Sequence, residues 1–196
     1  MKQISVSGKK REATGKKASK LLRKEGLIPC NLYGIANESI SFAVAATDLR
    51  KVVYSPNVYV VDLTIDGEKH LAVMQELQFH PVTDALVHID FLEVTAEKPI
   101  VIGIPVKLNG LAQGVRDGGK INLAVRKLNV KAVYTNIPET LEIDVTNLQL
   151  GKSIKVGQLH FEGLDIVTSP DVVVCSVKAT RASRSAAAAT DDSAAQ

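Results

Sequence analysis

Two groups of polar side chains have residue types and spacing that could bind a polyanion. The first group is cationic: residues 1–26 hold nine Lys or Arg against only Glu12 and Glu25, which leaves 15 basic and 19 acidic residues in the rest of the chain. The net charge of +3 therefore divides into +7 near the N-terminus and −4 elsewhere. Such a local excess of positive charge indicates a polyanionic partner.

A helix is predicted over residues 16–25, within the stretch GKKASKLLRKEG. At about 100° per residue, Ala18, Leu21 and Leu22 fall on one face, and the Lys and Arg side chains spread over the opposite side. Gly26 is a natural end for this helix, because glycine accepts the left-handed conformation that often follows a helix C-terminus.

The cations of this helix have few carboxylates nearby, so they repel one another unless an external partner neutralises them. Lys10 and Arg11 extend the same positive field upstream, and Tyr33 can add an aromatic or hydroxyl contact downstream. A nucleic-acid backbone fits this pattern. A solvated amphipathic helix is the alternative interpretation, and membrane binding is disfavoured because the apolar face is narrow and lacks aromatic anchors.

The second polar group belongs to a predicted strand around residues 86–92. Side chains alternate along a strand, so His88 and Asp90 share one face. Together with Gln75 they can form a polar surface that hydrogen-bonds base edges, with the aspartate accepting from an amino group. An acidic residue in a cationic site needs such a reason, because it would otherwise repel phosphate.

Gln78 and His80 precede this strand and are included among the predicted nucleic-acid contacts. His80, His88 and Asp90 could also supply nitrogen and oxygen ligands to a metal ion. They are scattered without a tight spacing pattern, however, so no metal site is predicted.

The stretch GVRDGGKI matches a phosphate-binding loop only in part. Gly114, Gly119 and Lys120 fit the pattern G-x-x-x-x-G-K-[ST], but Ile121 stands where a Ser or Thr would bind magnesium. The following residues alternate like a strand rather than a helix, so a hairpin turn explains the glycines more simply. No other catalytic or dinucleotide-binding motif is found, and the sequence predicts no enzyme, no cofactor and no small-molecule substrate.

Most of the chain is expected to form strands, because segments rich in Val, Ile and Leu alternate with polar residues. The predicted fold class is mostly β with a few short helices. Asp66-Gly67 is a strong hairpin signal, and a second helix is expected over residues 47–53. The main predicted strands are 39–44, 58–65, 70–77, 86–94, 100–108, 121–134, 140–146 and 172–178.

Proline residues at 99 and 105 mark a change in the pattern of the chain, and we place a domain boundary near Glu97. Residues 1–96 are predicted to form the nucleic-acid-binding domain and residues 97–180 a second domain rich in β-strands. The small, polar tail at 181–196 cannot bury enough apolar surface to offset its ordering entropy and is expected to be disordered.

The location of the protein is predicted from what the sequence lacks. It has no apolar run of about 18 residues to span a bilayer and no hydrophobic region typical of a secretory signal, which predicts a cytoplasmic protein. Cys30 and Cys175 lie far apart and neither belongs to a C-x-x-C pair. Buried, reduced thiols are therefore expected rather than a disulfide or a zinc site.

Two stretches carry a resemblance to a known family: KREATGKKASKLLRKEGLIPCNLYG (10–34) and QELQFHPVTDALVHIDF (75–91). They resemble the signature regions of the bacterial ribosomal protein L25 family. The region that follows, with GVRDGGKI and IPETLEIDVTNLQLGKSI, is similar to the C-terminal domain of the long form of this family, called TL5 or general stress protein Ctc. The resemblance covers about residues 1–180.

The resemblance implies a structural protein of the large (50S) ribosomal subunit, with an N-terminal β-barrel-like domain that binds 5S rRNA and neighbouring ribosomal proteins as further partners. Members of the family grip an internal-loop region of this RNA through its minor groove and the adjacent backbones. A-form RNA offers hydroxyls and base edges in that groove, while its phosphates attract cations.

Carried over by position, the family's phosphate and sugar contacts fall on Arg11, Lys16, Ser19, Lys20 and Arg23. The groove-facing residues are Tyr33, Gln75, His88 and Asp90. Two positions depart from the family: Lys20 stands where some members carry Arg, and Phe79 occupies a position that is basic in some members.

Other functions remain open from the sequence. One is a stress-related factor that binds RNA or proteins off the ribosome, and another is an anticodon-recognition module, which the absence of a synthetase catalytic region makes weak. A nucleotide hydrolase is the enzyme alternative, and Ile121 argues against it. The full predicted RNA-binding set is Lys10, Arg11, Lys16, Ser19, Lys20, Arg23, Tyr33, Gln75, Gln78, His80, His88 and Asp90.

Overall fold

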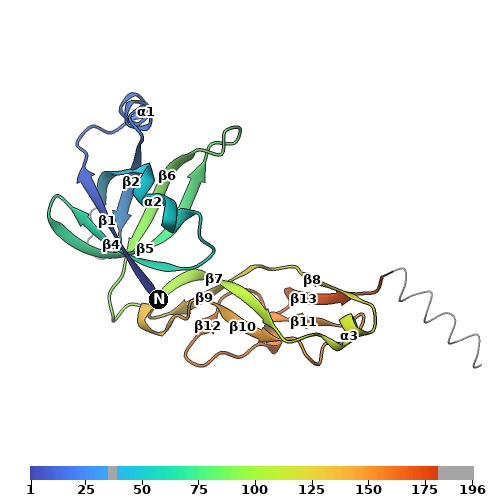
Figure 1. The fold of residues 1–196 in the computed structure, drawn as a ribbon. Helices are drawn as coiled ribbons and strands as arrows, with labels where there is room; N and C mark the ends of the chain where they lie inside the picture. Colours follow the sequence, from blue (N-terminus) through green and yellow to red (C-terminus); the bar gives the residue numbers. More distant parts are fainter. Residues whose placement is uncertain (35–38, 181–196) are drawn as a thin grey trace, which may run out of the picture. The chain divides into compact units, whose positions relative to one another are not determined.

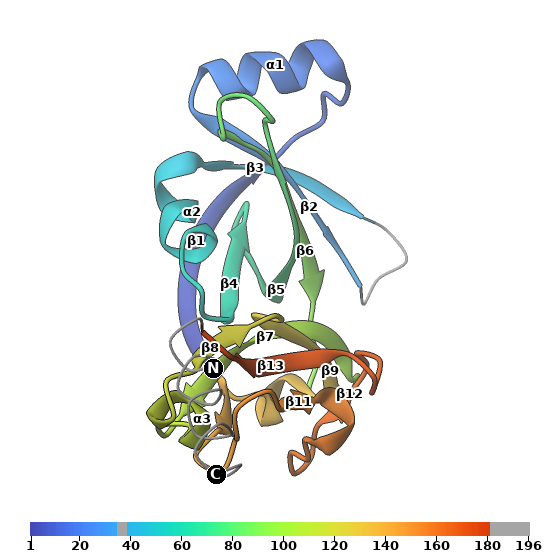
Figure 2. The ribbon, with the colours of Figure 1, turned by 90° about the vertical axis from the view of Figure 1, so that its right-hand side faces the viewer.

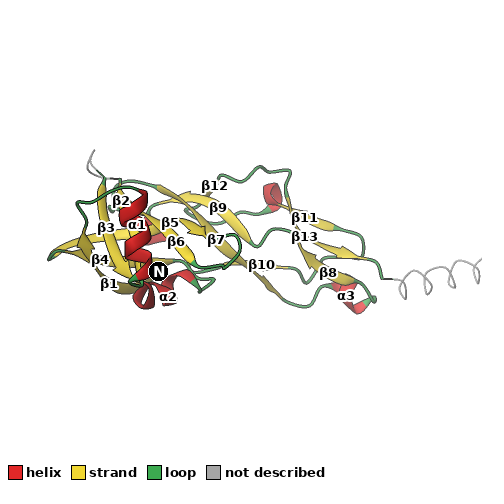
Figure 3. Cartoon of the chain, turned by 90° about the horizontal axis from the view of Figure 1, so that it is seen from above, coloured by secondary structure: helices red, strands yellow, loops and turns green. Residues whose placement is uncertain are grey.

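The computed structural model describes residues 1–34 and 39–180 and confirms the predicted fold class, because strands dominate and the helices are short (Figures 1 and 3). The chain divides into two compact units. The first consists of Met1–Ile100 with Ala132–Glu139, and the second of Val101–Lys131 with the chain from Thr140 onward. The tail predicted to be disordered, 181–196, lies outside the described residues.

The first unit is built on a closed barrel with the strand order β1-β3-β2-β6-β5-β4, in which β4 pairs with β1 to complete the ring (Figure 2). Two of the pairings are parallel, β1 with β4 and β2 with β6. The strands are β1 (Lys2–Lys10), β2 (Leu27–Tyr33), β3 (Ile40–Ala45), β4 (Tyr59–Ile65), β5 (Glu68–Phe79) and β6 (Leu86–Glu93).

Alternating apolar residues fill the interior of this barrel. Phe42 and Phe91 are fully buried and contact each other with ring centroids 5.9 Å apart. Two helices accompany the barrel, α1 (Lys16–Lys24) and α2 (Ala46–Val53). Helix α2 buries Leu49, Val52 and Val53, whereas α1 buries no residue fully. Helix α1 therefore depends little on the core and presents most of its surface outward.

The predicted helix at 16–25 and the strands from 39 to 94 are confirmed within a few residues. Gly26, with φ of 79°, lies just beyond α1 as expected. The turn at Asp66-Gly67 joins β4 to β5, also as expected, and both residues have positive φ. Helix α1 and the β5–β6 hairpin project from the same end of the barrel (Figures 1 and 2).

The second unit contains two small sheets, with strand orders β10-β7-β9-β12 and β11-β13-β8. A short helix, α3 (Gln113–Arg116), precedes β8. The strands are β7 (Ile100–Asn109), β8 (Lys120–Leu123), β9 (Lys127–Ala132), β10 (Leu141–Asp144), β11 (Ser153–Lys155), β12 (Asp165–Ile166) and β13 (Val173–Lys178), and the unit contains the 3₁₀ turn η2 (Val156–Gln158). A further 3₁₀ turn, η1 (Tyr134–Asn136), belongs to the first unit.

Two sequence predictions are wrong in this unit. The single strand expected at 121–134 is divided between β8 and β9, which belong to different sheets. The stretch GVRDGGKI does not form a hairpin turn: it contains most of α3, and the flanking strands β7 and β8 do not pair. Within residues 1–34 and 39–180, no helix is long and apolar enough to cross a membrane.

Both cysteines are free and buried, as the sequence predicted. Burial, reinforced by the negative charge of Asp90, raises the pKa of the Cys30 thiol to about 12, and burial also raises the pKa of Cys175.

Only the thiolate reacts rapidly with alkylating reagents. We therefore expect labelling by iodoacetamide at pH 8 to be slow in the folded protein and rapid at both thiols after unfolding in guanidinium chloride, as counted by mass spectrometry. Rapid labelling of either thiol in the folded protein would contradict this expectation.

Candidate nucleic-acid interface

The inward face of helix α1 differs from the predicted one. Ala18 and Leu22 are half-buried, as expected, but Leu21 is 60% exposed. Ser19 takes the third inward position and is half-buried. The prediction that Leu21 packs inward is therefore wrong, because the helix is rotated so that Ser19 lies at the boundary between the inward face and the cations.

The outward face of α1 carries a cationic stripe of Lys16, Lys20 and Arg23, which follow one another at i, i+4 and i+7 and are all exposed. Arg23 is oriented by a hydrogen bond from its Nε to the backbone oxygen of Val87, 3.1 Å away. Val87 is the extra residue of a β-bulge in β6, and a bulge leaves backbone groups outside the sheet ladder. The bond uses only Nε, so the two terminal nitrogens can donate to a phosphate.

This bond connects the helix to the polar side of the sheet. On β6, His88 Nδ1 lies 3.5 Å from Asp90 Oδ1, which confirms that these two side chains share a face. Gln78 of β5 pairs with His88, and Asn31 of β2 pairs with Asp90. Three adjacent strands of the barrel therefore contribute polar groups to one surface.

Gln75 lies at a second β-bulge, where β5 has one residue more than β6. Gln75 and Glu76 are together opposite Asp90, and the register pairs Glu76 with Asp90. Gln75 remains exposed at the bulge. Glu76 was missed because simple alternation gives the wrong register after a bulge, and no local signal in the sequence marks this one.

Tyr33 is the last residue of β2, lies beside the carboxylates of Asp90 and Glu76, and is 39% exposed. Partial burial raises the pKa of its hydroxyl, and the negative charges of Asp90 and Glu76 raise it further. The hydroxyl therefore stays protonated at neutral pH and can donate a hydrogen bond. We refer to Tyr33, Glu76, Gln78, His88 and Asp90 as the polar strand surface.

Arg11 and Lys10 lie where β1 ends. Lys10 is exposed, and its backbone N–H donates to Asp66 Oδ2 at 3.3 Å. The Arg11 guanidinium lies close enough to Cys30 for its charge to act on that thiol. Within residues 1–34 and 39–180, Arg11 Nε and Nη1 are buried without a hydrogen-bond partner. Unpaired buried donors are costly to a fold.

Comparison with known proteins decides the family. Residues 6–91 match the model of the ribosomal L25p family, and residues 99–181 match that of the ribosomal protein TL5 C-terminal domain. A large ribosomal subunit protein bL25 from Porphyromonas gingivalis is 52% identical over 95% of this chain and 98% of that protein. The proteins of the same name from Phocaeicola vulgatus and Bacteroides thetaiotaomicron are each 50% identical over 96% of this chain and 98% of their own length.

The chain belongs to the ribosomal L25p family. The resemblance found in the sequence is thus confirmed. The region matched by the L25p model contains α1, the polar strand surface and the whole predicted RNA-binding set.

In this L25p barrel, His80 has a structural part in the β5–β6 hairpin. Its Nδ1 lies 3.3 Å from the backbone nitrogen of Val82 and 3.4 Å from that of Thr83, so it accepts from the N–H groups of the turn. The ring therefore carries its proton on Nε2 in this arrangement. His80 shapes the hairpin tip and leaves only Nε2 for an outside partner.

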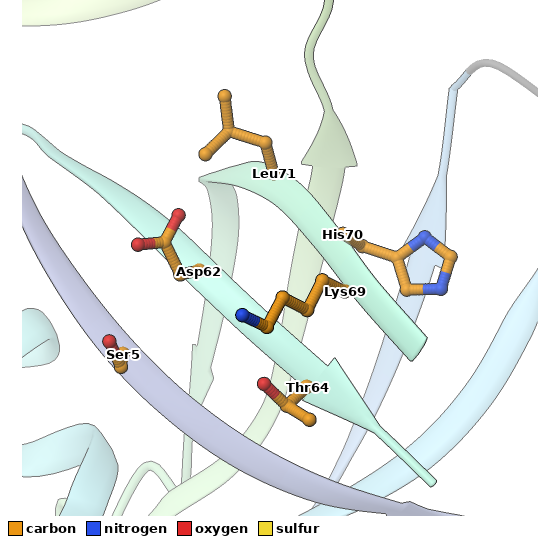
Figure 4. A pocket seen from close by; sticks show the side chains of 6 residues that line it. All are labelled: Ser5, Asp62, Thr64, Lys69, His70 and Leu71. Carbon is orange, nitrogen blue, oxygen red and sulfur yellow. The ribbon is translucent and has the colours of Figure 1, made fainter. Parts of the chain in front are cut away.

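A hollow of about 440 Å³ on the same L25p barrel is lined by none of the predicted RNA-binding residues (Figure 4). It is lined by residues of β1, β4 and β5, among them Asp62, Lys69 and His70. The ring of His70 points away from Asp62 (Figure 4), and its Nδ1 lies 2.8 Å from Glu93 Oε1. The histidine is thus paired with Glu93 and forms no catalytic pair with Asp62.

Proposed function

We propose that this chain binds 5S rRNA, with the cationic stripe on the phosphates and the polar strand surface in the minor groove. As a member of the L25p family, the protein is a structural component of the large ribosomal subunit and not an enzyme. Its place is with the ribosome in the cytoplasm.

The observation that carries this proposal is the bond between Arg23 Nε and the oxygen of Val87, which places the cations of α1 beside the polar strand surface. An A-form helix has backbones on both sides of a wide, shallow minor groove that displays hydroxyls and base edges. A row of cations beside a row of polar groups matches that arrangement.

The test compares binding of the full chain to purified 5S rRNA and to tRNA over a series of salt concentrations. We expect tighter binding to 5S rRNA, and affinity for both RNAs that falls steeply as salt rises, because each neutralised phosphate releases a counterion. Equal affinity for the two RNAs would contradict the proposal. Co-sedimentation with large subunits measures association with the ribosome independently.

The role of Asp90 is tested by the preference of the protein for 5S rRNA over tRNA rather than by its affinity for one RNA alone. Replacing Asp90 with Ala removes an acceptor for base amino groups or hydroxyls, and we expect the ratio of 5S rRNA to tRNA affinity to fall roughly tenfold, as for one base contact of about 1–3 kcal/mol. Asp62→Ala is the matched control, since it removes one negative charge from β4 of the same barrel. Both variants should bind tRNA slightly better, and only Asp90→Ala should lose its preference for 5S rRNA. If the ratio of 5S rRNA to tRNA affinity were the same in both variants, the role assigned to Asp90 would be refuted.

A further inference from the structure

Two large aromatic side chains contact each other on the surface of the first unit. Tyr54, which follows α2, is 64% exposed, and Phe79, the last residue of β5, is 42% exposed. Their ring centroids lie 6.4 Å apart, with 54° between the ring planes. Burying this apolar surface would be favourable, yet neither ring is covered by the described part of the chain.

Cationic side chains lie beside this aromatic pair. A hollow of about 540 Å³ next to Tyr54 is lined by Ala46, Thr47 and Arg50. Arg50 and Lys51, in the last turn of α2, are exposed, and neither forms an ion pair with the residues that the structure describes. The opposing charge on this helix is Asp48 in its first turn. The surroundings of the rings therefore favour an anionic partner.

The pair adjoins the polar strand surface along β5 but lies on the opposite face of the strand. Phe79 follows Gln78 directly in β5, and Gln78 pairs with His88. Successive side chains of a strand point to opposite faces, so the β5–β6 hairpin carries polar groups on one face and the aromatic pair on the other. Phe79 is one residue, about 3.3 Å along the strand, from Gln78, but its ring lies on the other face of the hairpin.

We propose that Tyr54 and Phe79 form a second RNA contact, on which an unpaired base of ribosomal RNA stacks while Arg50 and Lys51 hold its phosphates. This inference extends the proposed function, because it adds a site on the opposite face of the hairpin. Aromatic rings beside a guanidinium are the usual means by which proteins hold unstacked bases.

The charges distinguish this partner from a protein. The centre of a protein–protein interface is depleted of Lys and is built from a broad, close-packed apolar patch. Here two rings stand beside Arg50, which lines the adjoining hollow together with Tyr54, and Lys51 is the next residue of α2. One base with its phosphates satisfies both the rings and the charges.

Affinity measurements with leucine variants test the stacking. Tyr54→Leu and Phe79→Leu keep an apolar side chain and remove the ring, so they separate stacking from general burial. We expect each variant to bind ribosomal RNA about 5- to 100-fold more weakly, as for the loss of one base–aromatic stack. Val82→Ala, at the exposed hairpin tip, is the control and should bind like the parent. Thermal unfolding verifies that all variants fold.

A tryptophan reporter gives a second readout that does not depend on affinity. The chain contains no Trp, so Tyr54→Trp introduces a single indole that can still stack. We expect its fluorescence to be quenched by at least one of the two purified ribosomal RNAs of the large subunit, whereas Val167→Trp, exposed in the second unit, is not quenched.

The outcomes separate this inference from the proposed function. If 5S rRNA binds normally but the leucine variants match the parent and the indole of Tyr54→Trp is not quenched by either RNA, the second contact is refuted and the main interface stands. If 5S rRNA is not bound but the other RNA quenches that indole, the main interface is refuted and the second contact stands. Quenching by intact large subunits, with none by either purified RNA, also overturns the inference.

Discussion

Replacing Lys16, Lys20 and Arg23 together by Gln should lower the affinity of the protein for 5S rRNA by about 100- to 1,000-fold at moderate salt. The three side chains form one exposed stripe on α1, and each is expected to neutralise one phosphate. Glutamine keeps a high helix propensity, so α1 should persist. The plot of log affinity against log salt should become shallower by about 2 to 3, which filter binding at four or five salt concentrations can measure.

The second unit offers a matched control for this variant. Lys107, Lys127 and Lys131 are exposed on β7 and β9, and their replacement by Gln removes the same charge from the chain. If the effect came from net charge alone, both triple variants would weaken binding equally. We expect the control to retain the salt dependence of the parent. An unchanged slope in the α1 variant would show that the stripe does not contact the RNA backbone.

The sequence predicted those parts of the barrel whose signals are local. Strands β3 to β6 were found because Val, Ile and Leu alternate along them, and Asp66-Gly67 marked the turn between β4 and β5. Strand β1 has only two large apolar residues, Ile4 and Val6, among polar ones, and β2 contains Pro29, so neither gave a clear pattern. Closure of the barrel depends on parallel pairs between strands distant in sequence, which no local pattern encodes.

The candidate interface shows the same limit. His88 and Asp90 were placed on one face because they lie two residues apart in an uninterrupted stretch of strand. Glu76 was missed because the bulge at Gln75 shifts the register of β5 by one residue. The bulge at Val87 could not be foreseen either, yet it supplies the carbonyl that orients Arg23. The residue types thus indicated a nucleic-acid partner, whereas the two bulges determine which side chains of β5, β6 and α1 lie beside one another.

The glycines of GVRDGGKI, which imitate a phosphate-binding loop, are explained by close packing in the second unit. Gly114 donates its N–H to the oxygen of Leu148 at 2.9 Å, and a Cβ at Gly114 would lie 2.5 Å from the backbone nitrogen of Leu150. A Cβ at Gly119 would lie 2.6 Å from both Leu150 Cδ1 and Val177 Cγ1. These glycines allow α3 and the start of β8 to pack against the chain at 148–150, which requires no phosphate.

Gly114→Ala should therefore destabilise the second unit by about 3 kcal/mol, because the clash is with backbone atoms that cannot rotate away. Gly151→Ala is the control: Gly151 has φ of 76°, and a Cβ added there would meet no atom within 4 Å, so only backbone strain of about 1 kcal/mol is expected.

The two buried cysteines report on the two units separately, because Cys30 lies in β2 of the barrel and Cys175 in β13 of the second unit. With fast reclosing, labelling follows the population of the open state, so a loss of about 3 kcal/mol should accelerate labelling of Cys175 about 100-fold in Gly114→Ala and leave Cys30 unchanged. Equal acceleration of both thiols would mean that the units unfold together. No acceleration at Cys175 would mean that the chain at 148–150 moves aside for the methyl group.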